Sequence, residues 1–378
     1  MQRIATVAIL AFTVFLVACN GGGGGSTPAP IATVPANPGG PGGHPGPTPS
    51  PSPSAASGPL VYIANSYTSI VGFPINTGGN IQPAKTISGP QTQLYGVNYL
   101  AFDANGNLYA TNSVPPFSPG TLNIVVFAPG SSGNVAPARM IEGPNTGFGG
   151  AQILQQMGFD SAGNLYVAED IRNSTGIFAE VSIFPPNANG NVTPLRTIIA
   201  PCAYPTGLAV TPAGEVSIVC QPGDPQNPSP PEIVTFAAGA TGSATPSRII
   251  AGPNTQLNAD NEMWLYNGIL YVAANGPNNT PAAILGFPQN ANGDVAPTVV
   301  IRGSSTQLSN DTVGVTGINA TGQLYASNGG TSQSSQWSIT EYASGANGNV
   351  APINVITGPN TTLPTGFGPP MPIAVGPP

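Results

Sequence analysis

The residues best suited to chemistry are three asparagines and one glutamate that share a position in a repeated pattern. Asn65, Asn112, Glu169 and Asn328 each lie three residues after a tyrosine in a short apolar segment. Oxygen atoms of carboxylates and amides are the ligands that Ca²⁺ prefers. If these segments are strands that end around a common channel, their oxygens could hold calcium, which is the one cofactor the sequence suggests.

The same asparagines have a structural explanation. An asparagine at a strand end can bond the backbone of its own loop. Two of the six equivalent positions, Cys220 and Ala274, offer no oxygen ligand. We therefore favour the capping interpretation and predict no catalytic residue.

The composition excludes several classes of function. The only histidine is His44, which lies before the repeats, so Ser–His and Cys–His nucleophile pairs and histidine zinc sites are excluded from the repeats. The 7 Lys and Arg are outnumbered by 14 Asp and Glu, for a net charge of −7. This balance excludes the basic surface that nucleic-acid binding requires, and also docking on anionic lipid through a basic patch.

An imperfect repeat runs through the chain from residue 58 onward. An aromatic residue is followed by Gly, Pro and Ile at fixed spacing, as in Phe73, Gly79, Pro83 and Ile87. β-branched segments that end in a glycine turn predict a β-hairpin, and the proline marks a strand start or an edge. The copies begin at Phe73, Phe127, Phe184, Phe236, Phe287 and Tyr342.

A second hairpin precedes each of the later copies. The segment 102–109 recurs at 159–166, 210–217 and 318–325, with a shortened version at 265–271. Two hairpins per repeat give a four-stranded antiparallel blade, and such blades must stack in a ring to bury both faces. The sequence therefore predicts an all-β fold, a six-bladed β-propeller over residues 59–378.

The two ends of this region complement each other. The first copy begins at Leu60 and lacks an innermost strand, whereas residues 371–375 match an innermost strand with no hairpin after it. We expect the C-terminal strand to complete and close the first blade. In these repeats, and most clearly in the segment Asp160–Ala168, the chain resembles NHL-type and gluconolactonase-like propellers.

That resemblance implies a second function. Gluconolactonase-like enzymes hold a divalent metal with Glu, Asp and Asn near this place, and this chain offers Glu169, Asp170 and the asparagines there. The alternative function is therefore a metal-dependent hydrolase of lactones or esters. The metal would polarise a carbonyl, and Glu169 would act as a ligand or a base.

Residues 1–19 are expected to be a lipoprotein signal peptide. Arg3 precedes an apolar run too short to span a bilayer comfortably, and the run ends in Leu16-Val17-Ala18-Cys19. This end resembles the lipobox of bacterial lipoproteins, which implies cleavage before Cys19 and acylation of that cysteine. Asn20 follows where the inner-membrane retention signal of enteric bacteria has Asp, so we expect the outer membrane or the cell surface.

Residues 20–58 are expected to be a disordered tether. They are rich in Gly, Pro and Ser and contain no Lys, Arg, Asp or Glu. Such a segment cannot bury enough apolar surface to offset its chain entropy. The tether would hold the propeller away from the membrane, so that the lipid is the only contact with it.

Together these features predict an exported, lipid-anchored monomer that acts as a non-enzymatic binding or scaffold module at the cell envelope. The loops on one face of the ring vary in sequence, and propellers usually keep their binding surface there. The expected partner is an envelope protein or a glycan. The variable loops are 112–123, 169–180, 221–232, 275–282 and 328–337.

The remaining motifs have structural interpretations. Cys202 and Cys220 lie in the fourth repeat, where hairpin folding places them opposite each other, so a disulfide is plausible in an oxidising compartment. A repeated Gly-Pro-Asn-Thr, as at 143–146, is interpreted as a turn. Basic residues at one outer-strand position are interpreted as edge-protecting surface charges: Lys85, Arg139, Arg196 and Arg248.

Overall fold

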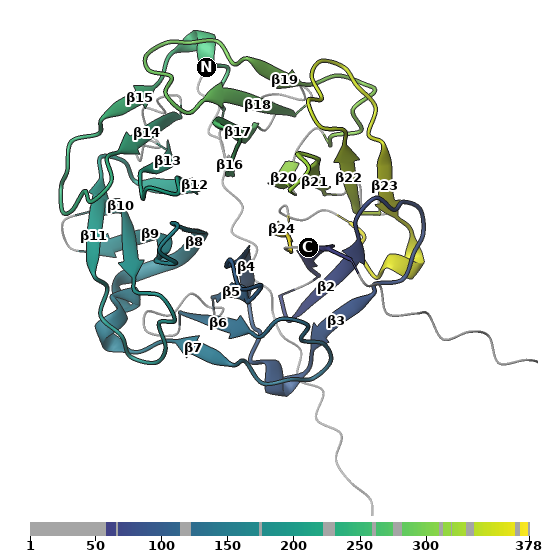
Figure 1. Cartoon of the computed structure of the whole chain (residues 1–378), viewed down its shortest axis with the longest axis horizontal. Helices are drawn as coiled ribbons and strands as arrows, with labels where there is room; N and C mark the ends of the chain where they lie inside the picture. Colours follow the sequence, from purple (N-terminus) through teal and green to yellow (C-terminus); the bar gives the residue numbers. More distant parts are fainter. Residues whose placement is uncertain are drawn as a thin grey trace, which may run out of the picture. The chain divides into compact units, whose positions relative to one another are not determined.

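The described part of the chain forms six four-stranded antiparallel sheets arranged in a ring, which confirms the predicted six-bladed β-propeller (Figure 1). The structure is a computed structural model. It describes residues 58–65, 67–113, 122–173, 176–221, 231–258, 262–274, 282–309, 313–318, 320–329, 336–366 and 371–376.

We number the blades in chain order and give their strands from the central channel outward. Blade one contains β24 (Ile373–Val375), β1 (Leu60–Ala64), β2 (Ser69–Pro74) and β3 (Lys85–Ser88). Blade two contains β4 (Val97–Phe102), β5 (Leu108–Asn112), β6 (Asn123–Phe127) and β7 (Arg139–Ile141). Blade three contains β8 (Ala151–Phe159), β9 (Leu165–Asn173), β10 (Gly176–Phe184) and β11 (Arg196–Ala200).

The other three blades follow the same order. Blade four contains β12 (Tyr204–Val210), β13 (Val216–Gln221), β14 (Glu232–Phe236) and β15 (Arg248–Ile250). Blade five contains β16 (Met263–Tyr266), β17 (Ile269–Ala274), β18 (Ala283–Pro288) and β19 (Val299–Ile301). Blade six contains β20 (Val313–Ile318), β21 (Leu324–Asn328), β22 (Ser338–Tyr342) and β23 (Asn354–Thr357).

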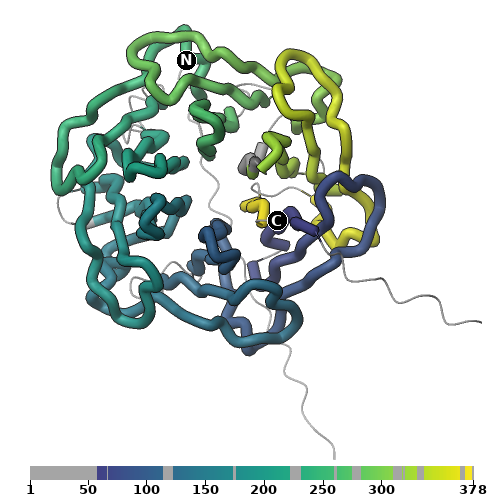
Figure 2. Tube along the Cα trace, viewed as in Figure 1, coloured from purple at the N-terminus to yellow at the C-terminus, as the bar shows by residue number. Residues whose placement is uncertain are grey.

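The C-terminal strand completes blade one, as the sequence predicts. Strand β24 pairs antiparallel with β1, with Val375 opposite Val61 and Ile373 opposite Ile63. The two ends of the described chain therefore lie side by side in one sheet (Figure 2). This pairing covers an edge of β1 that would otherwise expose unpaired backbone groups.

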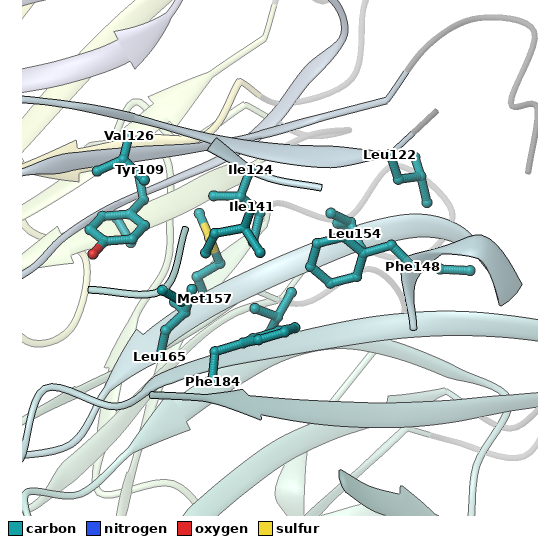
Figure 3. Close-up of a cluster of buried hydrophobic side chains, with 14 of the residues drawn as sticks. Tyr109, Leu122, Ile124, Val126, Ile141, Phe148, Leu154, Met157, Leu165 and Phe184 are labelled. Carbon is teal, nitrogen blue, oxygen red and sulfur yellow. The ribbon is translucent and has the colours of Figure 1, made fainter. Parts of the chain in front are cut away.

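The core consists of apolar clusters, each packed between neighbouring blades. Figure 3 shows the cluster between blades two and three, where Ile124 and Ile141 meet Leu154 and Phe184. All four of these side chains are completely buried. Each blade thus buries its two faces against its neighbours, which fixes the spacing and the tilt of the strands that carry the candidate site.

A second contact joins each blade to the next at the outer rim. The repeat isoleucine of each outermost strand forms a parallel bridge with the repeat glycine of the following blade, as Ile87 does with Gly133. In five of the six junctions the residue after that glycine also accepts a backbone N–H from the preceding blade's Gly-Pro turn or its equivalent. These acceptor pairs are Asn134 with Gln91, Asn191 with Asn145, Asp294 with Asn254, Asn349 with Ser305, and Asn80 with Asn360, at 2.7–2.8 Å.

The junction between blades three and four departs from this pattern. Ala200-Pro201-Cys202-Ala203 stands where the other blades have the Gly-Pro-Asn-Thr turn or its equivalent, and Ser243 stands where they have Asn or Asp. Here Cys202, which follows β11, forms a disulfide with Cys220 of β13, at a Cα–Cα distance of 5.5 Å. A covalent bond between the blades thus replaces the hydrogen bond between an Asn or Asp side chain and a backbone N–H that joins the other five junctions. We call this hydrogen bond the side-chain clamp.

Two of the repeated arginines, Arg139 and Arg196, also connect blades, which the sequence interpretation as surface charges did not include. The Arg139 guanidinium donates to the Tyr109 hydroxyl at 2.9 Å and to the Ala188 carbonyl of blade three at 3.1 Å. It also lies over the Tyr109 ring, 5.4 Å from its centroid. Arg196 makes the matching contacts one blade later with Tyr166 and with the Ala240 carbonyl.

A glutamine crosses the central channel. Bulges in β8 redirect Gln156, whose amide oxygen accepts from Leu208 N at 2.8 Å and from Met263 N at 3.2 Å. Its amide nitrogen donates to Met263 O at 2.6 Å. The side chain therefore joins the innermost strands of blades three, four and five.

Candidate functional site

The strand-end asparagines are held by their own loops. Asn112 is completely buried, and its amide oxygen accepts from Tyr95 N at 3.1 Å. Its amide nitrogen donates to the Gln93 carbonyl at 2.8 Å and to the Asn123 side chain at 3.0 Å. Asn123 in turn donates to the Tyr95 hydroxyl. The network closes the strand end of blade two onto the loop that leads into the blade.

Asn328 and Asn65 make the corresponding contacts in blades six and one. The Asn328 oxygen accepts from Ser309 N at 3.2 Å, and its nitrogen donates to the Thr340 hydroxyl at 3.1 Å. Asn65 donates to the Thr362 hydroxyl at 3.0 Å. These contacts favour the capping interpretation of the strand-end asparagines.

The four predicted residues do not fit one shared metal centre. Side chains alternate between the faces of a strand, and Ala110 packs in the cluster that faces blade one. Asn112 therefore points into the space between two blades and not into the channel, and Glu169 occupies the equivalent position one blade later. No group of three or more His, Cys, Asp or Glu residues gathers in the part of the chain that the structure describes.

Glu169 lies in a different environment from the asparagines. It is directly opposite Glu180 in the β9–β10 pairing, at the position that Asn112 and Asn123 occupy in blade two. Glu169 is completely buried, and neither carboxylate oxygen has a hydrogen-bond partner. The buried hydroxyl of Ser182, on the same face, likewise has none. Blade three thus places two carboxyl groups where blade two has a satisfied pair of amides.

Burial changes the acidity of this pair. Desolvation and, to a smaller extent, the charge of Glu180 raise the pKa of Glu169 to about 8. The Ser182 hydroxyl opposes this rise without reaching normal hydrogen-bond geometry. Desolvation also raises the pKa of Glu180. At neutral pH the pair therefore holds a proton and at most about one negative charge.

Asp170 faces the other side of β9, toward blade four. It is 8% exposed, and one of its carboxylate oxygens is buried without a partner. Burial raises its pKa to about 6, and the nearby Arg172 partly opposes the rise. Asp170 and Glu169 are therefore adjacent in sequence but belong to separate interfaces between blades.

The hairpin that carries these acids is longer than its counterparts. β9 and β10 have nine residues each, whereas β5 and β6 have five. Beside the extended end lies an open cleft of about 690 Å³, lined by Ile177, Phe178, Pro201 and Cys202 among others. The variable face of the ring therefore carries a cleft with apolar side chains next to the disulfide.

Sequence reasoning missed two residues of this region. Glu180 is the residue opposite Glu169, and aligning the outer hairpins of blades two and three would have shown that both members of the Asn112–Asn123 pair become acidic. Gln156 carries no such signal, because its partners lie 52 and 107 residues away. Predicted Cys19 and the tether up to residue 57 lie outside the described residues. No helix in the described part is long and apolar enough to cross a membrane.

Comparison with known proteins supports the fold and no specific activity. No protein-family model matches the sequence, and no curated protein matches it. A protein of unknown function from Bacteroides caccae superposes with a TM-score of 0.53 at 11% identity, over 84% of this chain and 98% of that one. A protein from Lactobacillus plantarum has a TM-score of 0.45 at 13% identity, over 84% and 99%. At such identities the first of these likenesses shows a shared propeller fold alone.

Proposed function

We propose that the chain is an exported lipoprotein whose propeller acts as a non-enzymatic binding module at the cell envelope. The observation that carries this proposal is the extended β9–β10 hairpin with the apolar cleft beside it. A rigid ring that extends one hairpin on its variable face is suited to hold a recognition surface. The partner is an envelope protein or a glycan that contacts Ile177 and Phe178.

The sequence supports the location. The residues up to Cys19 have the pattern of a lipoprotein signal peptide, and the Gly- and Pro-rich residues that follow provide a spacer. Metabolic labelling with a palmitate analogue should mark the chain and lose the label in Cys19→Ser. Label that persists in Cys19→Ser, or a chain recovered unlabelled from the cytoplasm, would contradict lipid anchoring.

The recognition surface can be tested separately. Ile177→Asp places a charge in the cleft, and in-cell crosslinking should then lose the adducts that the parent chain forms. Ile353→Asp is the matched control, because Ile353 is 49% exposed just before the outermost strand of blade six. Adducts lost equally in both variants, or in neither, would exclude the cleft as the recognition surface.

The alternative of a metal-dependent lactone or ester hydrolase receives less support. It needs the strand-end amides as ligands of a common metal, and the oxygens of Asn112 and Asn328 already accept backbone N–H groups of their loops. The geometry thus favours binding over hydrolysis.

A further inference from the structure

We propose that Glu169 and Glu180 form a binding site for an organic cation, a ligand with a primary ammonium group on an apolar stem. This inference rests on the proposed binding function and assigns a ligand chemistry to blade three.

The first support is the geometry of the two acids. Directly opposed residues of an antiparallel pair share a face of the sheet, so the Glu169 and Glu180 side chains are neighbours. Both oxygens of Glu169 and the hydroxyl of Ser182 are buried without partners. Leaving buried acceptors unpaired is costly, and a ligand that donates to the Glu169 oxygens would remove that cost.

The second support is the comparison with blade two. There the Asn112 amide donates to Asn123, and Asn123 donates to the Tyr95 hydroxyl, so the network contains its own donors. A carboxyl group donates only while it is protonated and then through a single O–H, so the two glutamates supply fewer donors than the two amides. An ammonium group would bring three N–H donors and one positive charge to this pair.

The third support is that basic side chains of the described chain are committed elsewhere. Arg172 lies on the same face of β9 as Asp170 and contributes to the pKa of that residue and not to that of Glu169. Arg139 and Arg196 bind tyrosine hydroxyls and backbone carbonyls. A positive charge at Glu169 would therefore come from a ligand.

The surroundings favour an organic cation over a divalent metal. Ile171 and Phe178 are the next opposed pair on the same face, and Phe148 and Leu154 belong to the same apolar cluster. Aromatic and apolar walls suit an ammonium group on an apolar stem. Calcium takes six to eight oxygen ligands, whereas this pair supplies two carboxyl groups that share a proton near neutral pH.

An exposed glycine segment lies beside the apolar wall of the proposed site. The 3₁₀ turn η3 (Phe148–Gly150) precedes β8, and Gly147, Gly149 and Gly150 are all exposed. A Cβ atom added at Gly149 would meet nothing within 4 Å, and one at Gly150 would meet only Ile171, at 3.9 Å. Gly149 and Gly150 thus add no side chain beside Ile171, whereas Phe148 of the same turn packs in the cluster.

The test is calorimetric titration of the full chain with n-butylammonium chloride at pH 7, in two buffers of different protonation enthalpy and at constant ionic strength. Binding should release close to one proton, because the ligand selects the ionised form of a pair that is protonated when free. Glu169→Gln and Glu180→Gln should each weaken binding about tenfold or more and abolish the proton release. Asp170→Asn, on the opposite face of β9, should leave both unchanged.

Three results would overturn the proposal. The first is that butylammonium does not bind, and the second is that Asp170→Asn weakens binding as much as Glu169→Gln does. The third is that Ca²⁺ binds instead of the amine and that Glu169→Gln abolishes the Ca²⁺ binding. Glutamine has the shape of protonated glutamate, so the thermal midpoints of the variants at pH 7 separate misfolding from loss of the site. If the amine fails to bind while Ile177→Asp still abolishes crosslinking, the cation site is wrong and the proposed binding function stands.

Discussion

At the scale of single residues, the candidate site is defined by a change of residue type at one repeat position. Asn112 and Glu169 occupy equivalent strand ends, but the first is satisfied by its loop and the second is buried without partners. An amide contains both a donor and an acceptor and can close a network by itself, whereas a buried carboxyl group must keep its proton or find a cation.

This difference predicts an unusual pH dependence of stability. The pKa of Glu169 is raised from 4.5 to about 8 in the folded chain, so the folded state binds more protons than the unfolded state between these values. The stabilising contribution is complete below pH 4.5 and is lost as the pH rises through 8. Asp170, raised to about 6, adds to the same trend. The free energy of unfolding should therefore fall by on the order of 5 kcal/mol between pH 5 and 9.

Urea unfolding followed by fluorescence at a series of pH values would measure this dependence. Glu169→Gln cannot ionise, so its stability should vary much less over the same range. Glu232→Gln is the matched control, because Glu232 is a partly buried glutamate of blade four whose pKa is also raised. A slope that is unchanged in Glu169→Gln would show that another group titrates.

At the scale of elements, blade three differs from its neighbours in two linked ways. Its second and third strands are nine residues long, and its junction with blade four has a disulfide in place of the side-chain clamp. Pro201 and Cys202 then line the cleft together with Ile177 and Phe178. The junction that gives up the repeated turn is thus the one that presents the cleft.

The disulfide should contribute measurably to stability. Cys202 and Cys220 close a loop of 18 residues, for which chain entropy predicts about 3 kcal/mol. The double variant Cys202→Ser with Cys220→Ser should lose about that much in urea unfolding. Intact-mass analysis of the parent chain after alkylation should show neither of these two thiols free.

The loss of a single clamp hydrogen bond at another junction provides the comparison. Asn134→Ala removes one clamp hydrogen bond between blades one and two and should cost about 1 kcal/mol. If the double cysteine variant costs no more than Asn134→Ala, the disulfide does not hold the junction.

At the scale of the whole molecule, the ring is closed twice. Strand β24 pairs with β1 near the channel, and Asn80 of blade one accepts the backbone N–H of Asn360 in blade six at the rim. The same clamp that joins consecutive blades therefore also joins the last blade to the first. Blade one is therefore held both near the channel, by β24, and at the rim, by blade six.

Weakening the inner closure should destabilise the entire ring. Ile373→Ala in β24 removes a side chain that is 1% exposed and should cost about 2–4 kcal/mol. Ile353→Ala, at a residue that is 49% exposed, should stay within about 0.5 kcal/mol of the parent. Thermal and urea unfolding of both variants would compare them. Equal stability of the two would mean that the ring does not depend on β24.

Much of the architecture follows from local sequence. The glycines of the second hairpin predict turns, and the structure gives Gly106 and Gly163 positive φ angles of 78° and 80°. The missing innermost strand of the first repeat and the unpaired segment at the C-terminus predict the closing strand, because a propeller cannot leave that edge open. The glycine signal is strong because it arises from residues that are close in the chain and recurs in successive repeats.

The sequence by itself thus determined the fold class, the number of blades and the closing strand. Only the tertiary structure decided the direction in which Glu169 points, its partner Glu180, the bridging role of Gln156 and the clamps between blades. Their contacts join residues tens to hundreds of positions apart, and their energies depend on burial and on neighbouring blades. A local pattern specifies the hairpins and the alternation of side chains along a strand. The desolvation of Glu169 arises only when the blades are packed together.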